Sequence, residues 1–206
     1  VVSLGVPQTY PPSQVNGWLV SGPLTPTGAT CYTYPQELGA ELANAVGPYQ
    51  PDVTEYRTED RAALLQRIMD HVDNRFDAAD YLASHKDWDL FVMVDMSLDR
   101  LHHGFWRYAD PNHPRFDPTS PFSRAVRMVY EQVDRRVGQL VGLLPEDTAV
   151  LVVSDHGAQP LMGVVAINQW LVAHGYLSVH NPPSTPTPLA EVTVDWEKTQ
   201  CWATGG

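Results

Sequence analysis

The stretch Ala149-Val150-Leu151-Val152-Val153-Ser154-Asp155-His156-Gly157 decides the predicted fold. Its apolar residues predict a buried strand over 148–153, and an acid, an imidazole and a glycine follow directly. Apolar strands of this kind are typical of parallel sheets, whose ligand-binding residues lie at the carboxyl ends of the strands. Gly157 gives the backbone freedom for a sharp turn. We therefore expect Asp155 and His156 to bind one ion there. The alternative is a strand-end turn in which a buried Asp155 caps the loop.

A second stretch has the same organisation. The apolar residues 90–94 predict a buried parallel strand covered on both faces, and Asp99 and His103 follow it. A spacing of four places both side chains on one face of a helix, where a carboxylate and an imidazole can bind a divalent ion. The alternative is that Asp99 caps the helix and His103 is partly exposed. His102 points elsewhere, so we expect it to contact the metal ligands from behind, to contact substrate, or to lie at the surface.

The two pairs reinforce each other because each follows a buried strand, with one crossover helix between them. Four ligands of mixed oxygen and nitrogen type suit zinc or manganese better than calcium or magnesium. His113, in the polar loop 109–118, is a further candidate near the site, although loop histidines are usually solvated. The sequence therefore predicts a metal centre built from Asp99, His103, Asp155 and His156.

The remaining pattern alternates strands and helices. Apolar spacing predicts helices at 35–46, from Thr58 to about Leu82, 99–108, 121–144 (capped by Ser120 or Ser123) and 166–174, and further strands at 1–6, 15–21 and 191–196. His71 and His85 are expected at the surface or an interface. The order predicts an α/β protein with a mostly parallel sheet flanked by helices. We expect a single domain over 1–206, with irregular proline-rich loops at 7–35 and 181–188.

Composition excludes several classes of partner. Hydrophobic residues make up 43% of the 206 residues, and the net charge of −11 argues against binding to a nucleic-acid polymer and, more weakly, to an anionic membrane. No apolar run is long enough to span a membrane. The N-terminus has no charged n-region and no long apolar core, so we expect a cytoplasmic location. Two distant cysteines, Cys31 and Cys201, predict free thiols rather than a disulfide framework.

Several motifs together resemble the alkaline phosphatase superfamily, most closely its type I phosphodiesterase/nucleotide pyrophosphatase family. The specific ones are Asp99-Arg100-Leu101-His102-His103-Gly104-Phe105-Trp106 and Val152-Val153-Ser154-Asp155-His156-Gly157. Weaker support comes from Val6–Pro12 with Val15–Gly17, from Ser21-Gly22 with Leu24–Pro26, and from Asn168–Leu171 with Gly175–Leu177. The resemblance implies a three-layer α/β/α fold of the alkaline phosphatase type, incomplete in this chain.

The resemblance also implies two metal ions bridged by the phosphate, zinc being expected first and manganese second. Asp99 and His103 match the family's Asp-x-x-x-His pair, which binds one ion with a later histidine. Asp155 and His156 match the Asp-His pair, which binds the other ion with an earlier aspartate and a Thr or Ser nucleophile. The implied reaction is in-line attack by that hydroxyl, a covalent phospho-enzyme, and hydrolysis by metal-bound water.

Parts of this machinery are expected outside the 206 residues. The first strand, the early aspartate and the nucleophile are expected before Val1, and the later histidine after Gly206. Thr9, Thr25 and Thr27 are not convincing substitutes, because they lie in proline-rich loops that no strand carrying an aspartate precedes, so no catalytic residue is assigned. We expect the full-length protein to hydrolyse small-molecule phosphate esters and this piece to be inactive alone. The alternatives are a sulfatase or phosphomutase branch, or a non-catalytic α/β binding module.

Overall fold

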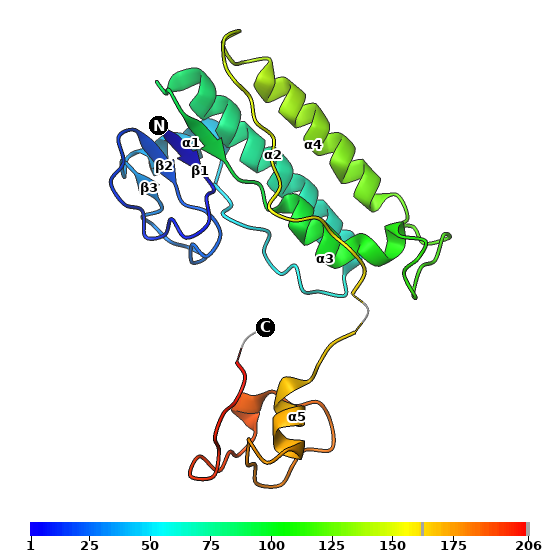
Figure 1. Cartoon of the computed structure of the whole chain (residues 1–206). Helices are drawn as coiled ribbons and strands as arrows, with labels where there is room; N and C mark the ends of the chain where they lie inside the picture. Colours follow the sequence, from blue (N-terminus) through cyan, green and yellow to red (C-terminus); the bar gives the residue numbers. More distant parts are fainter. Residues whose placement is uncertain (162, 205–206) are drawn as a thin grey trace. The chain divides into compact units, whose positions relative to one another are not determined.

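The computed structural model describes residues 1–161 and 163–204, which form two compact units (Figure 1). The first unit, Val1–Pro160, holds the sheet and four long or medium helices. The second, from Leu161 onward, holds helix α5 (Ile167–Ala173), a 3-10 turn (Leu189–Glu191) and an isolated antiparallel bridge between Val179 and Val194. The predicted strand at 191–196 is thus reduced to that bridge. The single domain over 1–206 stays a prediction.

The first unit contains a four-stranded sheet in the order β3-β2-β1-β4. Strand β1 (Val2–Leu4) pairs in parallel with β2 (Trp18–Val20) and with β4 (Phe91–Met93), whereas β2 pairs antiparallel with β3 (Thr33–Tyr34). Two of the three pairings are parallel, and the chain between β1 and β4 contains two helices. The predicted α/β class with a mostly parallel sheet is confirmed.

Helices α1 (Leu38–Val46) and α2 (Arg61–His85) pack against the sheet. They share a core with the inward-facing strand residues, formed by Val2, Leu4, Val20, Leu38, Leu42, Ala78, Ala79 and Leu82. The sequence placed the start of α2 at Thr58. The structure corrects this, because the Asp60 carboxylate is the side chain that accepts the N-terminal hydrogen bond, from Ala63 N at 3.0 Å.

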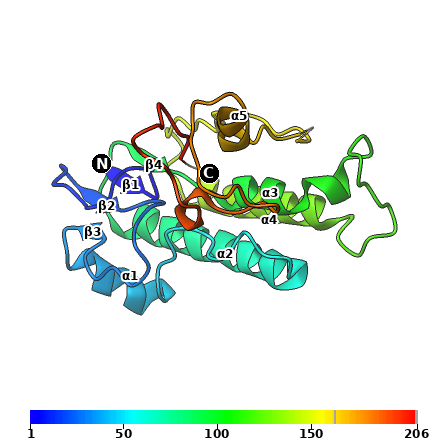
Figure 2. The same ribbon diagram turned by 90° about the horizontal axis from the view of Figure 1, so that it is seen from below.

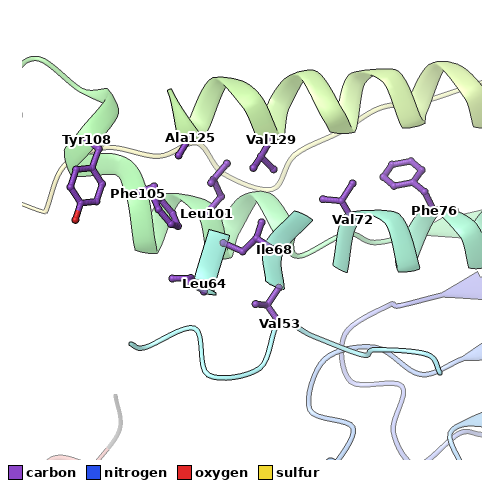
Figure 3. Close-up of a cluster of buried hydrophobic side chains, with 10 residues drawn as sticks. All are labelled: Val53, Leu64, Ile68, Val72, Phe76, Leu101, Phe105, Tyr108, Ala125 and Val129. Atoms are coloured by element: carbon purple, nitrogen blue, oxygen red, sulfur yellow. The ribbon is translucent and has the colours of Figure 1, made fainter. Parts of the chain in front are cut away.

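A second core lies between α2, α3 (Ser97–Ala109) and α4 (Ala125–Val141), which lie side by side in both overall views (Figures 1 and 2). Figure 3 shows its members, Val53, Leu64, Ile68, Val72, Phe76, Leu101, Phe105, Tyr108, Ala125 and Val129. Helix α4 follows Arg124 without a side-chain cap, so the predicted capping by Ser120 or Ser123 is wrong. This core fixes α3, and with it Asp99 and His103, against the rest of the unit.

The strand predicted at 148–153 is wrong. These residues have no regular secondary structure, and Leu151 and Val153 are 87% and 86% exposed. A strand forms only when a neighbour accepts and donates its backbone hydrogen bonds, and the described sheet ends at β4 without this segment. Strand β4 is likewise not covered on both faces, since Val92 is exposed. The apolar composition indicated that the segment is suited to burial, but composition does not determine whether a neighbouring strand is available to pair with it.

A buried polar chain joins α2 to the end of β4. His71 is fully buried, and its Nδ1 lies 2.9 Å from the Ser97 hydroxyl, which donates to Asp95 Oδ1 at 2.8 Å. Burial lowers the pKa of His71 to about 4 and raises that of Asp95. The expectation that His71 lies at the surface or an interface is wrong, because helical spacing alone does not reveal which helix packs over it.

Two simpler expectations concern the cysteines and membrane segments. Cys31 and Cys201 are free and exposed, as the sequence predicted. Among the described residues, no helix combines the length and apolarity that crossing a bilayer requires.

Candidate metal centre

Asp99 and His103 face each other on the first two turns of α3. Asp99 Oδ1 lies 3.6 Å from His103 Nε2, and the two side chains are 24% and 65% exposed. Two ligand atoms on one tetrahedral zinc ion lie roughly 3.3–3.6 Å apart, given metal–ligand bonds of roughly 2.0–2.2 Å. The pair therefore presents an oxygen and a nitrogen at a separation suited to a shared divalent cation. The spacing of four predicted this juxtaposition correctly.

Arg100 holds the other oxygen of Asp99. Its Nη1 donates to Asp99 Oδ2 at 2.8 Å, while Nε and Nη2 donate to Asp52 Oδ1 and Oδ2 at 3.0 and 2.6 Å. The Asp52 hydrogen bonds raise the pKa of the guanidinium. Its carbon also lies 4.3 Å from the centre of the Tyr56 ring. Arg100 thus orients Asp99 and leaves Oδ1 facing His103, a role that sequence reasoning missed because Asp52 lies 48 residues away.

Asp155 and His156 form the second pair, in the irregular segment after α4. His156 Nε2 lies 3.8 Å from Asp155 Oδ1, and the side chains are 64% and 90% exposed. His156 Nδ1 lies 3.0 Å from the carbonyl oxygen of Gly157. A proton on Nδ1 donated to that carbonyl leaves the Nε2 lone pair available to a cation. This hydrogen bond, followed by the Asp155 charge, raises the pKa of His156. The alternative, in which a buried Asp155 caps the loop, does not occur, because the side chain is exposed.

The two pairs are electrostatically coupled. The carboxylate of Asp99 contributes to the raised pKa of His156, after the Gly157 hydrogen bond and Asp155. Burial lowers the pKa of His102, the Asp99 charge opposes this, and the His103 and His156 charges add to the lowering. Hence the chain brings the Asp-His pair within electrostatic range of α3, although the strand expected to deliver it is absent.

His102 lies on the side of α3 that faces α4. Its Nε2 is 3.0 Å from the Tyr130 hydroxyl, and its ring meets the edge of Trp106 with the centroids 5.3 Å apart. His113 belongs to a local turn, where its Nδ1 accepts a hydrogen bond from Arg115 N at 3.0 Å. No interaction in the described chain links His113 to either pair. Their roles near substrate stay predictions.

The donor types and separations fit two half-sites for divalent cations, but neither half-site is a complete ligand shell. Among the described residues, no group of three or more histidine, cysteine, aspartate or glutamate side chains is close enough to hold a metal ion together. The oxygen and nitrogen atoms of each pair match the preference of zinc and related ions. The arrangement can therefore contribute two ligands to each of two ions, with further ligands required.

Comparison with known proteins adds one finding. The model of the family described as type I phosphodiesterase / nucleotide pyrophosphatase matches residues 2–203. No curated protein and no solved structure matches the chain. The match covers nearly the whole chain, including both ligand pairs, so the family expected from the sequence motifs is confirmed.

Proposed function

The chain belongs to the type I phosphodiesterase/nucleotide pyrophosphatase family, and on this premise we propose that it carries half of a two-metal hydrolytic site. The family acts on small-molecule phosphate esters. Two residues would hold each ion, Asp99 with His103 and Asp155 with His156. The observation that supports this most strongly is the pairing within each half-site, 3.6 and 3.8 Å between donor atoms, together with the electrostatic coupling of His156 to Asp99.

Zinc is the proposed metal, with manganese as the alternative. When bound, such ions neutralise charge on the transferring phosphoryl group and lower the pKa of the attacking hydroxyl and water. The chain's own residues orient the site. Arg100 fixes the Asp99 carboxylate, and the Gly157 carbonyl fixes the His156 ring. The proposed reaction is in-line attack by a hydroxyl, followed by hydrolysis of the covalent phospho-enzyme.

The nucleophilic hydroxyl is proposed to lie outside the described residues. The Thr9 hydroxyl donates to the Val6 carbonyl at 2.6 Å, and the Thr25 hydroxyl donates to the Gly22 carbonyl at 2.7 Å. Both hydrogen bonds stabilise the loops in which these threonines lie. Ser97 follows β4, but it is fully buried and donates to Asp95. These three hydroxyls donate hydrogen bonds within the fold, which supports the proposal that the 206-residue chain is inactive alone.

Hydrolysis of bis-p-nitrophenyl phosphate with added zinc or manganese tests the proposal. The full-length protein containing these residues is expected to release p-nitrophenolate, and Asp99→Asn or Asp155→Asn is expected to reduce kcat/KM at least about 100-fold. The isolated chain is expected to give no turnover above buffer. Robust turnover by the chain would overturn the nucleophile assignment. Unchanged turnover in both full-length variants would overturn the proposed metal ligands.

A further inference from the structure

A depression beside His103 is lined by two arginine side chains. It has a volume of about 360 Å³ and is lined by Tyr56, Arg57, Thr58, Glu59, Arg61 and His103. Its charged lining residues are two arginines and one glutamate, in a chain whose net charge is −11. Arginine clusters of this kind recognise phosphate or carboxylate groups through charge-assisted hydrogen bonds.

The depression is tied to the candidate metal centre by Arg100. The guanidinium that donates to Asp99 also lies 4.3 Å from the centre of the Tyr56 ring, and Arg57 lies 5.6 Å from the same centre. His103 belongs to both features, since it lines the depression and faces Asp99. Side-chain contacts within one unit therefore place the depression next to the Asp99–His103 pair.

The charge of Arg61 is only weakly neutralised. Its Nη2 lies 3.5 Å from Glu59 Oε2, but the Glu59 side chain is 93% exposed, so the pair is screened by water. Arg61 Nη1 donates to the Thr58 carbonyl, and its Nε is buried with no hydrogen-bond partner among the described residues. Because the Glu59 carboxylate is solvated, the Arg61 guanidinium keeps the capacity to pair with a further anion.

We propose that this depression is a specificity subsite for a second anionic group of the substrate, a phosphate or a carboxylate, separate from the ester that is cleaved. The inference rests on the proposed function, because the subsite adjoins the proposed metal ligand His103. Arg57 and Arg61 are its specificity-determining residues, and Tyr56 forms its wall. A phosphate ester with a charged group next to the scissile bond is accordingly preferred to one with a neutral alkyl or aryl substituent.

Metal-free binding measured by isothermal titration calorimetry tests the subsite on the 206-residue chain. The probes are inorganic pyrophosphate and succinate, which distinguish a phosphate from a carboxylate preference. Arg57→Gln and Arg61→Gln are each expected to weaken binding of the preferred probe about tenfold, and Arg57→Lys to restore most of it because the charge is kept. The control is Arg127→Gln, an exposed position on α4 paired with Glu131, which is expected to bind like wild type.

Absence of binding of both probes to the wild-type chain, or equal affinities in all variants, would overturn the subsite. Circular dichroism checks that each variant is folded. If Arg61→Gln unfolds α2, the Arg57 variants, which lie outside the helix, still test the subsite. Hydrolysis is not needed for this measurement. Normal anion binding by the chain, with no phosphodiesterase activity in the full-length protein, would therefore reject the proposed function but not the anion subsite.

Discussion

Replacing Arg100 by glutamine removes the charge that joins the loop around Asp52 to helix α3. The guanidinium makes a two-point contact with Asp52 at 3.0 and 2.6 Å and a third contact with Asp99 at 2.8 Å. Glutamine retains at most a neutral donor, so both carboxylates lose their cationic partner. The Tyr56 ring also loses a stacked cation.

The size of the effect follows from the burial of this network. Exposed ion pairs contribute about 0–1 kcal/mol, whereas breaking a buried pair costs roughly 3–5 kcal/mol. The side chain of Arg100 is 14% exposed and those of Asp52 and Asp99 are both 24% exposed, which is between these limits but nearer the buried one. Including a cation–π contribution of about 0.5–1 kcal/mol, we expect Arg100→Gln to reduce the free energy of unfolding by about 2–3 kcal/mol.

Urea unfolding followed by far-UV circular dichroism at pH 7 measures this change. Arg127→Gln, which breaks a highly exposed pair with Glu131, is the matched control and is expected to change stability by less than about 0.5 kcal/mol. A double-mutant cycle of Arg100→Gln with Asp52→Asn is expected to give a coupling energy of about 1–2 kcal/mol. Equal effects of the two arginine variants, or strict additivity in the cycle, would refute the reasoning.

Three further predictions concern the core around this site. Gly5→Ala is expected to reduce the free energy of unfolding in urea by about 3 kcal/mol or more, because φ is +73° and a Cβ would clash with the buried Arg75. Gly28→Ala, at φ +78° with open space around it, is expected to reduce it by only about 1 kcal/mol. Equal reductions in the two variants would contradict this. Because the native pKa of His71 is about 4 and the unfolded value about 6.5, its neutral form contributes stability above pH 6.5 that is lost as the pH falls toward 4. Urea titrations between pH 6.5 and pH 4 should therefore show that wild type loses on the order of 3 kcal/mol more free energy of unfolding than His71→Asn. Parallel pH profiles of the two proteins would contradict this. Leu64→Ala is expected to cost about 2–5 kcal/mol by the same assay, and a loss below about 1 kcal/mol would show that the site is not packed as described.

Local signals predicted the helices and the Asp99–His103 pair. The apolar spacing of Leu64, Ile68 and Val72 marks one face of α2, and a spacing of four on α3 brings Asp99 to His103. Both depend only on residues within one helix. Local sequence therefore predicts these features well, apart from the capping residues: Asp60 rather than Thr58 caps α2, and no side chain caps α4.

Features that depend on distant partners were not predictable in the same way. Residues 148–153 have the composition of a buried strand, but pairing depends on a neighbouring strand, and none of those described accepts them. The burial of His71 depends on Ser97, 26 residues away, and the orientation of Asp99 depends on the Arg100–Asp52 pair. Neither spacing nor composition identifies such contacts, because they arise from how whole helices and loops pack.

Anomalous diffraction at the zinc edge, from crystals of the chain soaked in zinc chloride, tests the two half-sites most directly. The account predicts one peak within about 2.0–2.2 Å of Asp99 Oδ1 and His103 Nε2, and a second at the same distance from ligand atoms of Asp155 and His156. Asp99→Asn is expected to remove or weaken the first peak and to leave the second. Zinc peaks at other residues only, or no peak at either pair at saturating zinc, would contradict the account.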